Sequence, residues 1–254
     1  MLTEYTPDDI CRAFTTLRVS ALALSFKEHY QKAVDEQLGI LQFMGTFLDH
    51  ELRERKQRRF ERLLKVANLD PSDSLENYDV ELARSRGVDI TQVRDLASGS
   101  YIAGSSMRNI VLAGAVGTGK TKLARTLAFE AVRRDYKAVV YNTRDLIENL
   151  YRMRDSHLFP KIYRRLVNLN VLVLDDLAYM TFAPEQVEYL FRIICDRTEK
   201  KTGPLIVTTN TDVQEWWQFF PSKAMGMAFS DRVLGGAIGI KFYGPSIRHE
   251  RESK

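Results

Sequence analysis

The segment GAVGTGKT, residues 114–121, constrains this chain more than any other stretch, because it fits the GxxxxGK(S/T) pattern of a phosphate-binding loop. It follows an apolar, strand-like run and precedes a helical pattern, which is the context that the pattern requires. In such a loop, glycines let successive backbone N–H groups face phosphate oxygens at a helix N-terminus. We therefore predict a nucleotide-binding site formed by Gly114, Gly117, Thr118, Gly119, Lys120 and Thr121.

Two acidic residues directly follow a strand-like apolar run, VLVL, at residues 171–174. Ligands of open parallel sheets lie at the carboxyl ends of the strands, so Asp175 and Asp176 are expected at the nucleotide site. We predict that Asp175 and the Thr121 hydroxyl hold Mg²⁺, while Lys120 reaches the β- and γ-phosphates. Asp176 is a candidate for polarising the attacking water, and capping of the following turn is the alternative.

Asn210, Arg232 and Arg248 complete the candidate catalytic residues. Asn210 ends the run LIVTTN, where its amide would orient the water between Asp176 and the γ-phosphate, although Asn at a strand end is by itself a turn former. Arg232 and Arg248 flank the last strand-like run. An arginine at a subunit edge can stabilise the γ-phosphate charge of a neighbouring subunit's nucleotide. A salt bridge or plain solvation is the alternative for Arg232.

The second half of the chain alternates short apolar runs with helix-length segments, a pattern typical of strands joined by crossover helices. Parallel strands need such crossovers and are buried on both faces. The pattern predicts an α/β three-layer domain over residues 109–254 with a five-stranded, mostly parallel sheet. The predicted strands cover residues 109–114, 137–142, 171–176, 204–210 and 239–244.

Residues 1–69 have a different period, because apolar residues such as Leu41, Phe43, Leu48 and Leu52 recur at helical spacing. We predict a small all-helical N-terminal domain for DNA or partner binding and for oligomerisation. The stretch DPSDSLENYD then supplies residues that favour turns. This places a domain boundary near Asp70 and a linker over residues 70–108.

Basic residues are bunched rather than spread evenly, which favours contact with an anionic polymer even though the net charge is only +4. Lys and Arg side chains at phosphates release counterions and bind without reading sequence. A solvated helix face is the alternative for the basic stretch within residues 53–65. The predicted DNA-binding residues are Arg53, Arg55, Lys56, Arg58, Arg59, Arg62, Arg133 and Arg134.

Composition excludes several other classes. The 44% hydrophobic content is enough for a buried core, and two distant cysteines, Cys11 and Cys195, encode neither a disulfide framework nor a zinc site. The first residues lack the features of a signal peptide, and no run of about 18 apolar residues occurs. We therefore expect a cytoplasmic protein without a membrane partner.

In its motifs the chain resembles an AAA+ ATPase, and more narrowly the IstB-like transposition helper proteins and the related DnaC-like replicative helicase loaders. The resemblance runs nearly end to end. It rests on GAVGTGKTKLARTLAFEAVRR, VLVLDDLAYM, LIVTTNTDVQEWWQFF, FSDRV and GPSIR, in the family's order, and on a helical N-terminal domain followed by SLENYD.

The resemblance implies roles for matching residues. Lys120 and Thr121 would act as Walker A, Asp175 and Asp176 as Walker B, Asn210 as sensor 1, Arg232 as arginine finger and Arg248 in a sensor-2-like role. It also implies ATP-dependent assembly into a ring or helical oligomer on duplex DNA that delivers or stimulates a cognate transposase.

Three alternatives remain open from sequence. A helicase loader would keep the ATPase but serve a replicative helicase and prefer single strands. A small-molecule kinase would need an acceptor pocket and a lid. A nucleotide-gated binding protein with negligible hydrolysis stays open because Asp176 stands where many AAA+ proteins have Glu.

Overall fold

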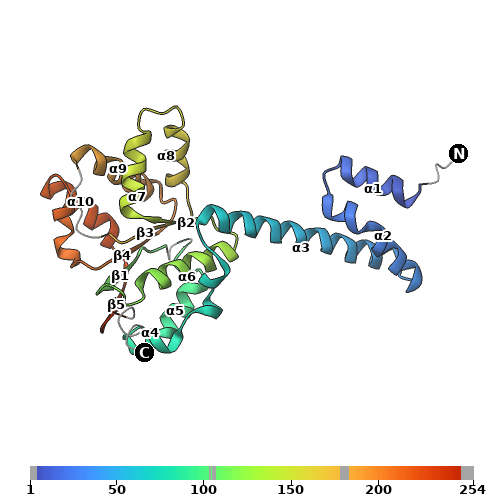
Figure 1. Cartoon of the computed structure of the whole chain (residues 1–254), viewed down its shortest axis with the longest axis horizontal. Coiled ribbons are helices and arrows are strands. Elements are labelled where there is room, and N and C mark those ends of the chain that lie inside the picture. Colours follow the sequence, from blue (N-terminus) through green and yellow to red (C-terminus); the bar gives the residue numbers. More distant parts are fainter. Residues whose placement is uncertain (1–4, 103, 105–106, 178–182, 247–254) are drawn as a thin grey trace. The chain divides into compact units, whose positions relative to one another are not determined.

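The computed structural model of this protein describes residues 5–102, 104, 107–177 and 183–246. Contacts between residues divide the chain into two compact units, Met1–Arg62 and Leu63–Lys254. Each unit is described by itself below (Figure 1).

The first unit is helical. It contains α1 (Pro7–Thr16), α2 (Ser20–Asp35) and the first part of α3 (Ile40–Ala67). Its small core is aromatic, and the rings of the buried Phe26 and Phe47 lie 5.5 Å apart between centroids in an edge-on arrangement. The predicted helical N-terminus is confirmed.

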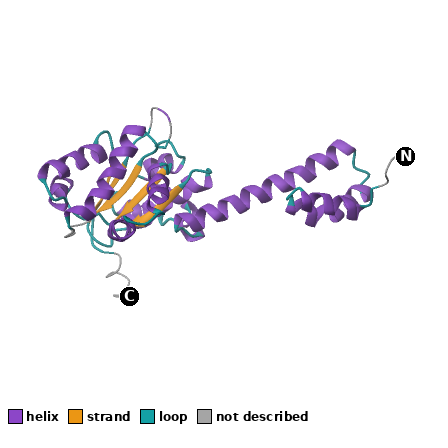
Figure 2. Ribbon diagram, turned by 90° about the horizontal axis from the view of Figure 1, so that it is seen from above, coloured by secondary structure: helices purple, strands orange, loops and turns teal. Residues whose placement is uncertain are grey.

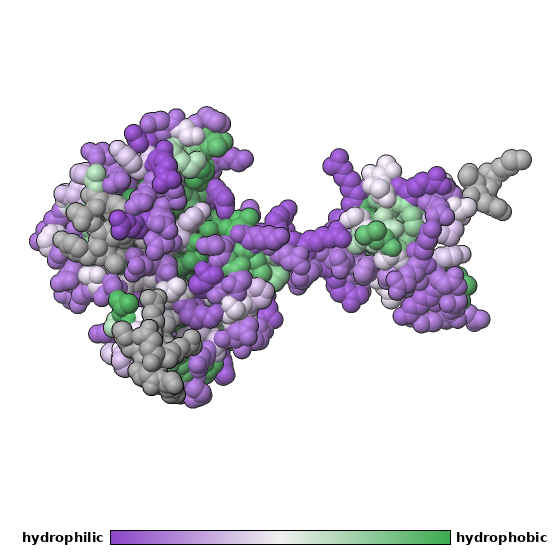
Figure 3. All heavy atoms as spheres, in the orientation of Figure 1, coloured by the Kyte–Doolittle hydropathy of each residue, from purple (hydrophilic) through white to green (hydrophobic). Residues whose placement is uncertain are grey.

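The leucines that produce the helical period of α3 do not form this core. Leu41, Leu48 and Leu52 are 88%, 48% and 64% exposed, whereas Phe43 and Phe47 pack against α1 and α2. Two short helices can cover only one face of α3, so its other apolar residues stay at the surface. Figure 3 shows hydrophobic residues on the surface of this unit.

The boundary between the units differs from the predicted one, because it lies inside α3 and not after residue 69. The predicted linker belongs to the second unit. It forms η1 (Pro71–Asp73), η2 (Leu75–Asn77), α4 (Val80–Ser85) and α5 (Ile90–Ala97). Asp, Ser and Pro are favoured both in turns and at the start of short helices. Composition therefore could not distinguish a linker from a series of short helices.

The second unit contains one five-stranded parallel sheet in the order β2-β3-β4-β1-β5. Each strand lies within the predicted range or one residue beyond it, and the predicted α/β class is confirmed. The order places β4 between β3 and β1, so the carboxyl ends of these three strands are neighbours. The strands are β1 (Ile110–Gly114), β2 (Ala138–Asn142), β3 (Val171–Asp175), β4 (Leu205–Thr209) and β5 (Ile238–Phe242).

Helices cover both faces of this sheet, as Figure 2 shows. One layer contains α5 and α6 (Lys120–Arg133), and α6 crosses beneath β1, β2, β3 and β4. The opposite layer contains α7 (Thr143–Met153), α8 (Phe159–Val167), α9 (Pro184–Lys200), η4 (Val213–Phe219) and α10 (Lys223–Leu234).

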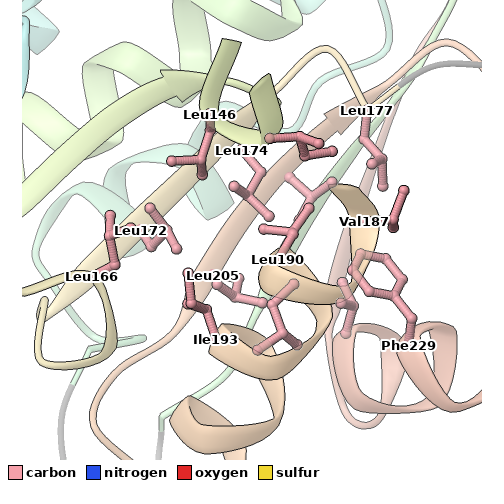
Figure 4. Close-up of a cluster of buried hydrophobic side chains, with 14 of the residues drawn as sticks. Leu146, Leu166, Leu172, Leu174, Leu177, Val187, Leu190, Ile193, Leu205 and Phe229 are labelled. Atoms are coloured by element: carbon pink, nitrogen blue, oxygen red, sulfur yellow. The ribbon is translucent and has the colours of Figure 1, made fainter. Parts of the chain in front are cut away.

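Alternate residues of the central strands point into the opposite layer. Leu172 and Leu174 of β3 pack with Leu190 and Ile193 of α9 and with Phe229 of α10, and all five are buried (Figure 4). Burial of both faces of β3 and β4 makes the position of their carboxyl ends rigid. No described helix combines the length and the apolar character needed to cross a membrane.

A buried arginine holds the loops that lead into β3 and β4. Arg197 of α9 is 2% exposed and donates to the main-chain oxygens of Leu166, Leu169 and Gly203 at 2.8, 2.9 and 3.0 Å. Burial lowers the pKa of Arg197 to about 10. Its guanidinium thus donates several hydrogen bonds to carbonyl groups that are shielded from solvent.

Candidate functional site

The predicted phosphate loop joins the end of β1 to the start of α6. Gly114, Gly117 and Gly119 have φ values of 152°, 74° and 103°, in the region that favours glycine. A Cβ at Gly114 would meet the main-chain oxygen of Phe242, and one at Gly117 would meet the side chain of Ser246. The loop thus lies directly beneath the segment that leaves β5.

Lys120, the first residue of α6, is folded back into this loop. Its ammonium donates to the main-chain oxygens of Gly114 and Ala115 at 2.8 and 2.7 Å, and the residue is 8% exposed. Burial lowers the pKa of Lys120, and the charges of Asp176 and Asp175 oppose that shift. A phosphate would offer this ammonium better acceptors than the two carbonyl oxygens.

Thr121 and Asp175 meet across the ends of α6 and β3. The Thr121 hydroxyl donates to Asp175 Oδ1 at 2.9 Å, so the two predicted metal-binding side chains are adjacent. Mg²⁺ prefers hard oxygen ligands and is usually held by one or two protein groups together with phosphates and waters. This donor set fits Mg²⁺, and the described residues contain no denser cluster of acidic, His or Cys side chains.

Asp176 lies just beyond β3 on the same edge. Its φ is 59°, its side chain is exposed, and its charge acts on Lys120 more strongly than that of Asp175 does. Asp176 thus lies at the carboxyl end of β3, the edge that also carries the phosphate loop, and this is the position that the water-polarising role requires. The alternative, capping of the following turn, concerns residues 178–182, which lie outside the described residues.

Asn210 follows β4, whose carboxyl end lies between those of β3 and β1. Its side chain is exposed, and its Oδ1 accepts from the Thr211 hydroxyl at 3.3 Å. The residue therefore sits at the edge that carries Asp175 and the loop, and it also belongs to a local turn. Both sequence interpretations of Asn210 agree with this position.

Arg232 lies near the amino end of β1, whereas the phosphate loop lies at the carboxyl end of that strand. The Asn109 side chain, just before β1, donates to the main-chain oxygens of Arg232 and Val233 at 3.1 and 3.0 Å. The phosphate loop begins after the five residues of β1, about 16 Å away at the rise of a strand. The Arg232 guanidinium donates to the oxygen of Ala228 within α10 and lies over the ring of Phe191. Arg232 therefore cannot serve the loop of its own subunit, and Arg248 lies outside the described residues.

The predicted linker contributes residues that the sequence interpretation missed. A pocket of about 380 Å³ opens beside the phosphate loop, between the start of α6 and the segment before and within α4. Tyr78, Leu82 and Phe242 give it apolar walls next to Thr118 and Gly119. Its complete lining is Asn77, Tyr78, Asp79, Leu82, Ala83, Thr118, Gly119, Lys122 and Phe242. A sequence signal for these helices was available, because Val80 and Ala83, and likewise Ile90 and Val93, are apolar residues three positions apart.

Several of the basic residues predicted to bind DNA have acidic partners within the chain. Arg133 pairs with Glu76 at 2.6 Å, and Arg134 pairs with the buried Glu130 at 2.9 Å. In α3, Arg55 pairs with Glu51 at 2.6 Å. These pairs reduce the charge available to a polyanion. DNA contact through this set stays a prediction.

Comparison with known proteins identifies a family whose model covers most of the chain. The model of the family described as "IstB-like ATP binding protein" matches residues 13–254. The insertion sequence IS5376 ATP-binding protein of Geobacillus stearothermophilus is 28% identical over 232 residues, covering 91% of this chain and 90% of that protein. An insertion sequence ATP-binding protein of Sinorhizobium fredii is 30% identical over 219 residues, covering 86% of this chain and 72% of its own length.

Solved structures resemble the second unit's fold. AMPPCP-bound DnaA from Aquifex aeolicus has a TM-score of 0.55 and 20% identity, with 72% of this chain and 56% of that chain covered. The DnaC helicase loader has a TM-score of 0.54 and 20% identity, and the match covers 68% of this chain and 98% of that chain. These similarities confirm the predicted AAA+ type of fold.

Proposed function

This chain belongs to the IstB-like ATP-binding protein family, and from that premise we propose that it is an ATP-dependent, DNA-binding regulator of transposition. The observation that carries the proposal is the juxtaposition of Lys120, Thr121 and Asp175 at the end of β1 and β3. Nucleotide binding assembles subunits on duplex DNA, the assembly recruits or stimulates a transposase, and hydrolysis resets it.

ATP is the proposed ligand of the phosphate loop. The loop N–H groups and Lys120 would bind its phosphates, and the pocket formed by Tyr78, Leu82 and Phe242 would take the nucleoside. Thr121 and Asp175 would hold Mg²⁺, which when bound neutralises charge on the β- and γ-phosphates. The names of the family and of its relatives support ATP as the nucleotide.

Hydrolysis is assigned to Asp176 and Asn210. Asp176 would accept a proton from the attacking water, and Asn210 would orient that water from the adjacent strand. The shorter Asp reaches less far than Glu, so slow turnover is expected. Slow turnover suits an ATPase that times an assembly.

Assembly of subunits is proposed from the position of Arg232. Arg232 lies at the amino edge of the sheet, beyond reach of its own phosphate loop. A guanidinium can stabilise the γ-phosphate charge of a second copy's nucleotide. Arg232 would thereby link turnover to contact between subunits.

The insertion-sequence relatives and the basic residues of α3 support the proposed DNA binding and transposase partner. Lys56 and Arg62 are the strongest candidates, since neither forms an ion pair with another residue in the described part of the chain. Each phosphate contact they make would add to the salt dependence of binding.

The deciding experiment is the mass distribution of the protein on duplex and single-stranded DNA of equal length, with ADP and with a slowly hydrolysed ATP analogue. We expect large assemblies only with the analogue and duplex DNA. A preference for single strands would favour the helicase loader. Monomers under all conditions would reject the assembly role.

A matched pair of variants tests the DNA surface in the same experiment. Replacing Lys56 and Arg62 together by Ala should weaken assembly on DNA and reduce its salt dependence. Arg12→Ala removes an exposed cation of the same unit that is already paired with Asp9, and should have little effect. Equal effects of both variants would reject α3 as the DNA surface.

A further inference from the structure

Thr208 occupies a buried position between the two acidic residues of the nucleotide site. It lies in β4, two residues before Asn210, and is 1% exposed. Its hydroxyl donates to Asp175 Oδ1 at 2.6 Å and accepts from the Asp176 N–H at 2.8 Å. One side chain therefore contacts both acidic residues of β3 from the neighbouring strand.

The direction of these hydrogen bonds is fixed by chemistry. A backbone N–H can only donate and an ionised carboxylate can only accept, so the Thr208 proton must point to Asp175. Asp175 Oδ1 thus receives two donors, Thr208 and Thr121, at 2.6 and 2.9 Å. Two donors occupy both lone pairs of Oδ1, so Oδ2 is the Asp175 oxygen that would be available to hold Mg²⁺ or one of its waters.

The second hydrogen bond acts on the backbone of Asp176. That residue has a φ of 59°, a left-handed conformation that L-residues with a Cβ disfavour. The hydrogen bond from its N–H to Thr208 helps to hold the turn. Thr208 thereby fixes the backbone of Asp176 at the point where its side chain leaves β3, while the Asp175 side chain is hydrogen-bonded to Thr121 of α6.

We propose that Thr208 is a positioning residue that sets the orientation of Asp175 toward Mg²⁺ and of Asp176 toward the attacking water. The inference rests on the proposed nucleotide site and adds Thr208 of β4 to Asn210, which follows that strand. Asn210 is exposed and can contact a ligand directly. Thr208 is buried and would act only through its hydrogen bonds to Asp175 and Asp176.

The chain supplies a matched control in the next residue. Thr209 is 0% exposed, and its hydroxyl donates to the Leu177 oxygen at 2.7 Å without contacting either acid. Thr208→Val and Thr209→Val each remove one buried hydroxyl of β4. Only Thr208→Val removes the donor to the Asp175 carboxylate and the acceptor of the Asp176 N–H. Thr208→Ser keeps the hydroxyl and serves as the conservative variant.

The readout is the affinity for a fluorescent ATP analogue, titrated in Mg²⁺ and in EDTA, with the thermal unfolding of each variant measured alongside. We expect Thr208→Val to need about tenfold more Mg²⁺ for half-maximal binding, the size of one lost hydrogen bond to a charged group. Its affinity in EDTA should stay within about twofold of wild type, since the phosphate loop is unchanged. Thr208→Ser should behave as wild type.

Two outcomes would overturn the proposal. An equal change in Mg²⁺ requirement for Thr208→Val and Thr209→Val would show only a general loss of packing in β4. Wild-type protein that binds the analogue equally well in Mg²⁺ and EDTA would remove the metal role of Asp175 and Thr208. Neither outcome bears on DNA-dependent assembly, which the mass measurement above decides separately.

Discussion

Arg125 of α6 donates twice to the carboxylate of Asp73, from Nη2 at 2.7 Å and from Nε at 3.0 Å. Asp73 is 3% exposed and lies in the segment that leads to the nucleoside pocket. Burial by itself would raise the pKa of Asp73, but hydrogen bonds from Arg125 and from the Asp70 N–H hold it below its usual value. The pair thus fastens the segment 70–79 to the helix that begins at the phosphate loop.

The first prediction concerns this pair. Asp73→Asn should lower the free energy of unfolding of the second unit by about 2 kcal/mol at pH 7, because Arg125 loses its charged partner. A depressed folded-state pKa contributes stability above the unfolded value, about 4, and that contribution is lost as the pH falls below it. The stability difference between wild type and variant should therefore shrink on acidification below about pH 4.

Denaturant unfolding followed by tryptophan fluorescence provides the measurement, since Trp216 and Trp217 both lie in the second unit. Glu81→Gln is the control, because Glu81 forms an exposed pair with Arg84. A pH-independent difference between wild type and Asp73→Asn would contradict the assigned charge pair.

The second prediction concerns Lys120. Lys120→Met should abolish ATP binding yet leave the ligand-free protein within about 1 kcal/mol of wild-type stability. Burial lowers the pKa of Lys120, which means that folding disfavours its charge, so the uncharged side chain avoids that cost. Calorimetric titration with ATP and thermal unfolding test the two parts. Retained ATP binding would remove the phosphate-site assignment.

The third prediction concerns the nucleoside pocket. Leu82→Glu should weaken ATP binding by about tenfold or more, because it places a carboxylate and its water at an apolar wall beside the loop. Arg84→Ala changes the same helix at an exposed position and should leave affinity unchanged. Fluorescence titration compares the two variants. Equal affinities would show that the nucleoside lies elsewhere.

The fourth prediction tests Arg232 in trans. Arg232→Ala should leave ATP binding by isolated subunits intact and reduce turnover in assemblies by at least about tenfold. Mixing Arg232→Ala with Lys120→Ala protein should restore part of the turnover, because the second variant supplies Arg232 and the first supplies an intact loop. Mixtures no more active than either variant alone would reject action between subunits.

Sequence reasoning predicted the fold correctly where structure depends on local pattern. The loop at residues 114–121 needs glycines at set positions between a strand and a helix, and all of these requirements are local. The strands were predicted within about one residue because buried parallel strands are short continuous apolar runs. Asp175 and Thr121 could be paired in advance, since both follow from those two elements.

The same reasoning missed the packing of residues 70–79 and the ion pairs of Arg133 and Arg134. Turn-forming residues suggested a linker, but Asp73 finds a partner in Arg125 fifty-two residues later. Arg133 and Arg134 counted as free positive charge, yet Glu76 and Glu130 pair with them. Composition counts charges and turn formers, whereas their partners depend on which distant segments come together.

The amino-acid sequence by itself determined the parallel α/β class, the phosphate loop and the acids at the end of β3, because each follows from the order of neighbouring residues. Tertiary structure alone decided that Arg232 lies at the far edge of the sheet and that Thr208 contacts both acids. Strand order is not written in any local pattern. It is set by how the helices pack on both faces, and that packing places β4 between β3 and β1.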